Sequence, residues 1–147
     1  MPYFTYDTSV IVSRKIHDLH EMPKDFLLSA VVLMELTAGS SDTSVRKTYE
    51  RLFHQYRRDK LLIVPDDDWL LAAKIMFLLT QDRRREGRER LKRMPPGASQ
   101  RLALDVLIAV SARRCKAQIV TENWADFKAI QRYCNATIIK AAQFFRH

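Results

Sequence analysis

The sequence predicts a single α/β domain over residues 1–147, with a mainly parallel sheet between helical layers. Short runs rich in aromatic and β-branched residues alternate with longer segments of helical periodicity, which is typical of strands joined by crossover helices. A chain of 147 residues is long enough to bury a substantial hydrophobic core. Because no internal repeat or low-complexity segment divides the chain, one domain is expected.

Turn and capping residues bound the elements of the first half of the chain. The alternating stretch 3–6 predicts a strand that ends at Asp7, and Thr8 or Ser9 can cap the helix that follows. Gly39 is a suitable C-cap for the apolar helix after the second strand. In order, we expect a strand at 3–6, a helix to about residue 20, a strand at 26–29, a helix at 30–38, a helix from about 42 to 59 and a strand at 61–64.

The second half of the chain repeats this pattern. Asp66, Asp67 and Asp68 fit a helix N-terminus, where the macrodipole favours negative charge. They fit a metal cluster less well, because consecutive residues of a helix point in different directions. Ser99 can cap the helix that carries Asp105. In order, we expect a helix from residue 66 to about 79, a helix from about 99, strands at 118–120 and 137–139, and a final helix ending at 144–145.

Acidic side chains occur in unusually apolar surroundings. Asp105 has three apolar residues before it and five after it, so the helix that carries it must be largely buried. Asp7 closes the first strand, and Glu35 lies in the apolar helix after the second strand. Burying an unpaired carboxylate costs several kcal/mol, so such a group is expected to be paired or to bind a cation. Together with Asp126, these residues predict a metal-binding acidic cluster.

We expect the four carboxylates to converge at one edge of the sheet. In open parallel sheets, ligands bind beyond the carboxyl ends of the strands. Asp7 and the stretch 121–126 each follow a strand directly, Glu35 lies about one turn into a helix, and Asp105 precedes the fourth strand. Hard divalent cations prefer oxygen ligands. A bound ion can lower the pKa of a water molecule and neutralise charge at a phosphodiester.

Four short motifs carry a resemblance to a known family. They are DTSV at 7–10, MEL at 34–36, LDVLIA at 104–109 and VTENWADF at 120–127. In this order they resemble the motifs of the PIN-domain nucleases, most closely the VapC-type toxins of prokaryotic toxin–antitoxin modules. The resemblance covers nearly the whole chain. It implies a three-layer α/β/α sandwich with a four- to five-stranded sheet, and an endoribonuclease that requires Mg²⁺ or Mn²⁺ and acts as the toxin of a type II module.

The resemblance also implies residue roles and partners. The catalytic cluster would be Asp7, Glu35, Asp105 and Asp126, with Asp7, Asp105 and Asp126 as metal ligands and Glu35 supporting the ion or positioning the attacking water. The hydroxyl and amide groups of Thr8, Ser9, Thr121 and Asn123 would hold these carboxylates in place. A cognate antitoxin would insert a segment into the groove, and the nuclease would form a homodimer. The span between Glu35 and Asp105 is longer than is common in small members of the family.

Each acid also has a structural alternative. Asp7 can be only a helix N-cap, Glu35 can lie on an exposed helix face, and Asp126 can be a turn residue. Asp105 suits neither a cap nor an exposed face, because of its eight apolar neighbours. At the level of function, the alternative is a non-catalytic PIN-like module that binds RNA. Phosphatase chemistry of the haloacid-dehalogenase kind is disfavoured, because it needs a second Asp where this chain has Ser9.

Basic residues are concentrated in one segment. The net charge is +8, and residues 83–93 contain seven basic and two acidic residues, so they supply five of these charges. This predicts a polyanionic partner, most simply RNA. The expected contacts are Arg83, Arg84, Arg85, Arg88, Arg90 and Lys92. The alternative is a solvated helix end with an i,i+4 pair between Glu86 and Arg90. Trp69 and Trp124 can stack on bases or pack at the core and its rim.

Composition predicts the compartment. No run of 18 or more apolar residues occurs, and no signal-peptide pattern is present, so we expect a cytoplasmic protein with no membrane partner. Cys115 and Cys134 lie in no metal-ligand spacing, which favours reduced thiols.

Overall fold

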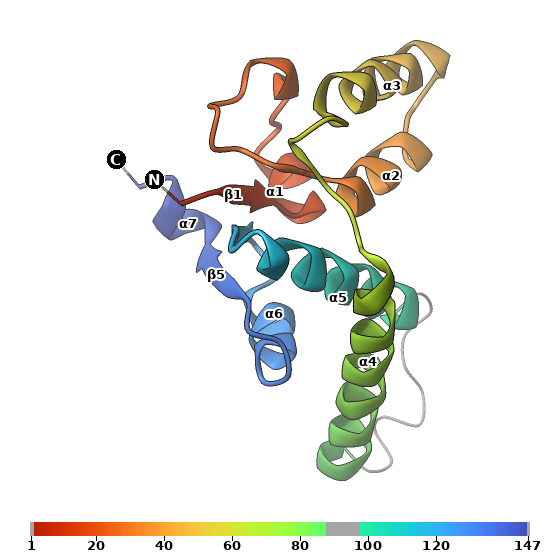
Figure 1. Cartoon of the computed structure of the whole chain (residues 1–147), viewed down its shortest axis with the longest axis vertical. Helices are drawn as coiled ribbons and strands as arrows, with labels where there is room; N and C mark the ends of the chain where they lie inside the picture. The colour runs from red at the N-terminus through yellow and green to blue at the C-terminus, as the bar shows by residue number, and fades with distance from the viewer. Residues whose placement is uncertain (1, 88–97, 147) are drawn as a thin grey trace.

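The computed structural model describes residues 2–87 and 98–146 (Figure 1). Every strand pair in this part of the chain is parallel, as the sequence predicts. The strands are β1 (Phe4–Tyr6), β2 (Leu28–Ser29), β3 (Leu61–Leu62), β4 (Gln118–Thr121) and β5 (Thr137–Lys140).

The strands form two groups rather than one continuous ladder. One group has the order β1-β4-β5, and the other pairs β2 with β3. A parallel bridge between Phe4 and Phe26 connects the groups, where the Leu27 amide donates to the Phe4 carbonyl at 2.9 Å. The expected four- to five-stranded sheet is therefore present as parts of three and two strands, because a single bridge, and not a ladder, connects β1 to the segment before β2.

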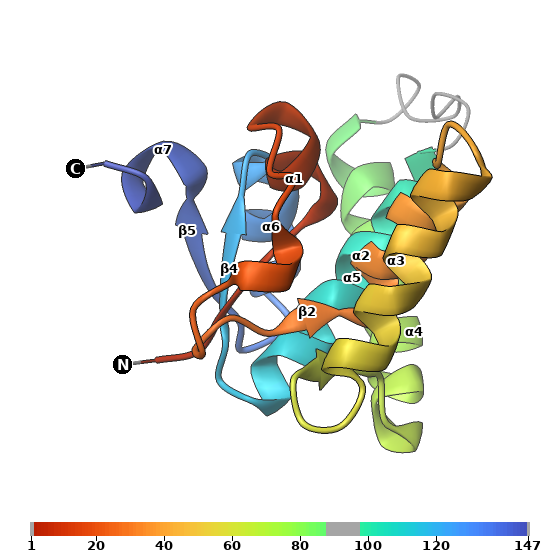
Figure 2. The same cartoon turned by 90° about the horizontal axis from the view of Figure 1, so that it is seen from above.

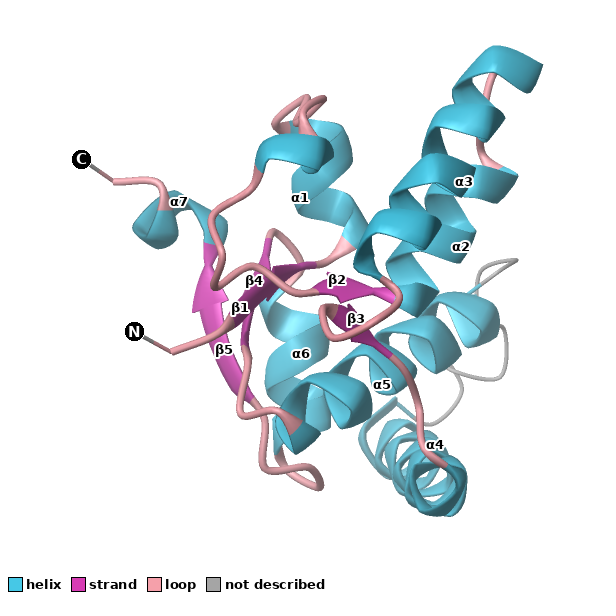
Figure 3. Cartoon of the chain, turned by 45° about the horizontal axis from the view of Figure 1, so that its top comes forward, coloured by secondary structure: helices cyan, strands magenta, loops and turns pink. Residues whose placement is uncertain are grey.

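Helices lie on both sides of the strands. Figure 3 shows α1 on one side of β1 and β4, with α5 and α6 on the other side. Helix α3 packs beside α2 (Figures 1 and 2). The helices are α1 (Thr8–Ser13), α2 (Ala30–Ala38), α3 (Thr43–Tyr56), α4 (Asp66–Gly87), α5 (Ala98–Arg114), α6 (Trp124–Gln131) and α7 (Ala141–Phe144), with a 3-10 turn at Leu19–Glu21. Among the described helices, none is long and apolar enough to cross a membrane.

The first helix is shorter than predicted. It was expected to reach about residue 20, but α1 ends at Ser13. Lys15 adopts a left-handed conformation with a φ of 51°, which a helix cannot continue through. The apolar residue Leu19, expected on the same helix, is instead buried in the separate 3-10 turn. The sequence pattern of apolar residues was therefore correct, and the helical reading beyond Ser13 was wrong.

Three further details differ from the sequence prediction. Ser99 lies inside α5, which begins at Ala98, so it does not cap that helix. Asp66, Asp67 and Asp68 lie in the first turn of α4, as predicted, but Asp68 has an unpredicted second role. It is buried and accepts hydrogen bonds from Arg113 and Arg114, which joins α4 to the end of α5. The stretch after β4 forms helix α6, which was not predicted.

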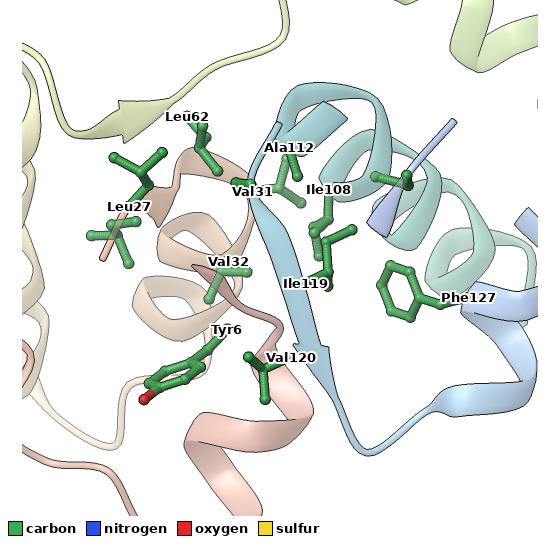
Figure 4. Packing of buried hydrophobic residues seen from close by; sticks show 14 of the residues in the cluster. Tyr6, Leu27, Val31, Val32, Leu62, Ile108, Ala112, Ile119, Val120 and Phe127 are labelled. Atoms are coloured by element: carbon green, nitrogen blue, oxygen red, sulfur yellow. The ribbon is translucent and has the colours of Figure 1, made fainter. Parts of the chain in front are cut away.

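The core anchors α5 and α6 against β4. Ile119 and Val120 of β4 are fully buried, and successive side chains of a strand point to opposite faces. Figure 4 shows Ile119 beside Ile108 of α5 and Phe127 of α6. Burying side chains of this size contributes about 1.5–3 kcal/mol each. This packing fixes the two helices that carry Asp105 and Asp126.

Candidate functional site

Asp7 lies directly after β1 and is held by three donors. One carboxylate oxygen accepts from the Ser9 hydroxyl at 2.6 Å and from the Val10 amide at 3.2 Å. The other accepts from the Thr121 hydroxyl at 2.6 Å. Burial raises the pKa of Asp7, and the bonds from Ser9, Thr121 and Val10 oppose that rise. Asp7 is therefore the N-cap of α1 and also a buried carboxylate with a fixed orientation.

The register of the sheet explains why Asp7 meets Thr121. Tyr6 and Val120 are paired in the parallel ladder of β1 and β4. The next residue of each strand therefore lies at the same edge of the sheet. The amide of Asn123 donates to the Thr121 hydroxyl oxygen at 2.8 Å, which fixes that hydroxyl group in turn.

Glu35 is half-buried on α2 and is held by Thr8. The Thr8 hydroxyl donates to Oε1 of Glu35 at 2.9 Å. Burial raises the pKa of Glu35, the bond from Thr8 lowers it, and the charge of Asp7 raises it. The side chain is therefore not on a fully exposed face, and its environment favours the protonated form more than water does.

Asp105 is the most strongly perturbed carboxyl group of the site. Burial raises the pKa of Asp105 to about 7, with further increases from the charges of Asp7, Asp126 and Glu35. The guanidinium of Arg101 opposes this shift. Asp105 therefore experiences the other three acids electrostatically, although they come from three other parts of the fold.

One pocket brings these residues together. Its volume is about 410 Å³. It is lined by Asp7, Thr8, Ser9, Glu35, Arg101, Asp105, Asn123 and Asp126. Asp126 is exposed and lies in the first turn of α6, so the alternative of a loop turn is wrong for this residue.

The sequence reading missed Arg101. It lies four residues before Asp105 on α5, and residues at this spacing are neighbours on a helix surface. This spacing was the available signal, but the sequence alone does not show that Arg101 faces the acidic pocket. Among the described residues that line the pocket, Arg101 carries the positive charge.

The donor set of the pocket suits a hard divalent cation. Four carboxyl groups offer oxygen ligands, which Mg²⁺ and Mn²⁺ prefer. Within residues 2–87 and 98–146, however, no group of three or more His, Cys, Asp or Glu side chains is arranged so that it could hold an ion. Magnesium usually keeps several waters and uses one or two carboxylates directly. The chemistry of these residues therefore fits such an ion, and water would bridge the ion to the carboxylates that do not bind it directly.

The basic segment is only partly described. Arg83, Arg84 and Arg85 lie at the C-terminal end of α4. Arg88, Arg90 and Lys92 lie outside the described residues, as does the rest of the segment from residue 88 to residue 93. The predicted contact between this segment and RNA stays a prediction.

Solved structures share the arrangement of elements described above. This chain is similar to a chain in the structure of FitAB bound to an IR36 DNA fragment. The TM-score is 0.58, and the match covers 98% of this chain and 99% of that chain. This chain also matches VapBC-1 from nontypeable Haemophilus influenzae with a TM-score of 0.56, covering 95% and 98%. The fold is PIN-like. DNA-bound VapBC from Salmonella typhimurium gives a TM-score of 0.52, covering 96% and 99%.

These similarities concern the PIN-like fold alone. Sequence identity is 16% to the FitAB and Haemophilus chains and 19% to the Salmonella chain. The sequence matches no family model and no curated protein. The matched chains are PIN-domain toxins of VapBC and FitAB toxin–antitoxin complexes, and the likeness to them runs over nearly the full length.

Proposed function

We propose that this chain is a metal-dependent endoribonuclease and the toxin of a type II toxin–antitoxin module. The observation that carries the proposal is the convergence of four carboxyl groups on one pocket. They come from the end of β1 and from α2, α5 and α6, and the PIN-like fold is what brings these elements together. Burial and the charges of three other acids raise the pKa of Asp105 to about 7, and such perturbed groups cluster at functional sites.

Asp7, Asp105 and Asp126 would hold Mg²⁺ or Mn²⁺, directly or through water. When bound, the ion supplies an activated water and neutralises negative charge on the phosphodiester. Ser9 and Thr121 orient Asp7 by their hydrogen bonds of 2.6 Å. These hydroxyl groups therefore decide which way the carboxylate oxygens face.

Glu35 would accept the proton of the attacking water or position that water. Thr8 donates to Oε1, so Oε2 would be the oxygen that serves this role. A raised pKa makes a carboxylate a better proton acceptor near neutral pH. Arg101, at the rim of the same pocket, would contact a phosphate oxygen of the substrate.

The matched complexes support a proposal about partners. FitAB and VapBC are two-component assemblies, and two of the matched structures contain DNA. For this chain we propose a cognate antitoxin, a homodimeric assembly and RNA as the substrate. An antitoxin that places a cation in the acidic pocket would relieve the repulsion among its carboxylates and block access to it.

A non-catalytic PIN-like module that binds RNA is the second candidate. The observation in its favour is that no set of three acids among the described residues stands ready to hold an ion. Such a module would bind RNA equally well with and without a divalent cation.

Cleavage of total cellular RNA separates the two candidates. Wild type, Asp105→Asn and Asp67→Asn would each be incubated with Mg²⁺, with Mn²⁺ and with EDTA, and the cut ends mapped by sequencing. Asp67 is the matched control, because it is an exposed acid on α4 outside the pocket. The nuclease predicts discrete cuts by wild type and Asp67→Asn that need metal, and none by Asp105→Asn. RNA that stays intact with every protein and metal would favour the binding module.

A further inference from the structure

The first turn of α6 separates the acidic pocket from a second hollow. Asn123 and Asp126 line the acidic pocket, whereas Trp124 and Ala125 line the second one. The second pocket has a volume of about 530 Å³. Its lining residues are Trp124, Ala125, Lys128, Ala129, Gln131 and Arg132. An extended ligand that leaves the acidic pocket across this turn would therefore reach the second pocket within about one helix diameter, roughly 10–12 Å.

Aromatic and cationic side chains share this side of α6. Trp124, Lys128 and Arg132 recur at four-residue spacing, which places them on one face of the helix. Nζ of Lys128 lies 5.6 Å from the centre of the Trp124 ring, and Nζ of Lys140 lies 5.1 Å from it. Trp124 is half-buried, whereas both lysines are exposed. We refer to Trp124, Lys128, Arg132 and Lys140 as the α6 surface.

The cations of the α6 surface differ in how firmly they are held. Arg132 forms an ion pair with Asp82 of α4 at 3.4 Å, which ties it to the protein. Lys128 donates to the neutral amide oxygen of Gln131 at 3.2 Å, and Lys140 lies against the indole ring. Two ammonium groups therefore lie over the Trp124 ring, next to the acidic pocket for which we propose a phosphodiester substrate.

We propose that the α6 surface binds a single-stranded RNA segment flanking the phosphodiester that is cut, with a base stacked on Trp124 and phosphates on Lys128 and Lys140. The inference rests on the proposed nuclease function and names the form of its substrate. Proteins that bind single strands combine a cationic track for the backbone with aromatic rings for the bases. A base in a duplex is stacked on its neighbours and cannot reach the indole ring, so single strands are selected.

The two tryptophans allow stacking to be observed directly. The chain has only Trp69 and Trp124. Two variants would be made in an Asp105→Asn background and studied with Mg²⁺. Trp69→Phe leaves Trp124 as the sole tryptophan. Trp124→Phe leaves Trp69, which is 55% exposed on α4, and serves as the matched control. Each protein would be titrated with an unlabelled single-stranded RNA of about 12 nucleotides, within the usual site size, and with its blunt duplex.

The proposal predicts that the single strand quenches the fluorescence of Trp124 strongly and that of Trp69 weakly. The duplex should quench Trp124 much less. Fluorescence anisotropy with a labelled single strand measures the affinity. Trp124→Leu should bind the strand at least about tenfold more weakly, because stacking of one base on an aromatic ring contributes about 1–3 kcal/mol to binding. Lys128→Ala and Lys140→Ala should each lower the slope of log K against log salt by about 0.7. Circular dichroism would verify that each variant is folded.

Two results would overturn the proposal. One is unchanged RNA affinity in Trp124→Leu, as expected if the surface instead receives a protein partner. The other is no measurable binding of the single strand to the Asp105→Asn parent. Failure of the nuclease proposal looks different: wild type would cut no RNA with any metal, while the quenching of Trp124 and the loss of affinity in Trp124→Leu persisted.

Discussion

The Thr121 hydroxyl donates a hydrogen bond to Asp7 at 2.6 Å, although 114 residues separate the two in the sequence. The bond exists because β1 and β4 are parallel neighbours whose carboxyl ends meet at one edge of the sheet. It joins a hydroxyl group in the last of the four sequence motifs, 120–127, to a carboxylate in the first, 7–10. The site is therefore a property of the strand order.

Removing the Thr121 hydroxyl should impair the site without removing a carboxylate. In Thr121→Val, Asp7 loses a donor that lowers its pKa, so its carboxylate becomes harder to ionise. We expect a 10- to 100-fold loss of cleavage and of Mn²⁺ affinity, the usual effect of removing such a partner. Thr48→Val on α3 is the control, because Thr48 is partly buried, lies outside the acidic pocket and donates to the Ser44 carbonyl of its own helix. Equal losses in both variants would contradict this role for Thr121.

Stability of the metal-free protein should fall as pH rises from about 5 to 8. The folded-state pKa of Asp105 is raised from 3.8 to about 7, so the folded protein binds more protons than the unfolded chain in this range. Ionising Asp105 then costs folding free energy, on the order of 2–4 kcal/mol between the two pH values. Urea unfolding in EDTA at pH 5 and pH 8 measures this difference in the free energy of unfolding. Asp105→Asn should lose most of this dependence, and an unchanged dependence would count against the assignment.

Arg101→Ala should raise the pH at which the site binds Mn²⁺ half-maximally. The guanidinium lowers the pKa of Asp105, so its loss raises that pKa further above its ordinary value. Mn²⁺ must displace the proton, so the pH at which Mn²⁺ binding is half-maximal should increase. Arg101→Lys keeps the charge and should restore the wild-type midpoint. A midpoint that is the same in all three proteins would show that Arg101 does not influence Asp105.

Asp68→Ala should destabilise the protein without changing the chemistry of the pocket. Asp68 is 1% exposed and accepts from Arg113 at 3.2 Å and Arg114 at 3.0 Å. Losing it leaves two cations without their partner, which we expect to cost about 1–3 kcal/mol, since both arginines are partly exposed. Asp67→Ala, at an exposed neighbouring position, should change stability by less than about 0.5 kcal/mol. Urea unfolding of the two variants measures the difference.

The sequence predicted the elements better than their ends and their long-range partners. All five strands and their parallel direction followed from apolar patterning and chain order. The early end of α1 depends on the left-handed conformation of Lys15, a residue type that gives no such signal. The partner of Asp68 could not be predicted, because Arg113 lies 45 residues away and the pair forms only when α4 meets α5.

The acidic pocket, too, could be predicted only in part. Patterning around Asp105 indicated a buried carboxylate, and strand order indicated where the others would meet it. Helix α6 was missed although Phe127 and Ile130 have helical spacing and are buried. Arg101 was missed because its role depends on facing the pocket, and only the fold decides that.

Calorimetric titration with Mn²⁺ measures whether the four carboxylates act together as a divalent-cation site. Wild type, Asp105→Asn and Asp67→Asn would be titrated at pH 7 in two buffers of different ionisation enthalpy. We expect one saturable binding event in wild type and Asp67→Asn that releases protons, because burial raises the pKa of Asp105 to about 7. Binding should be abolished or strongly weakened in Asp105→Asn. Equal Mn²⁺ affinity in all three proteins would contradict such a site.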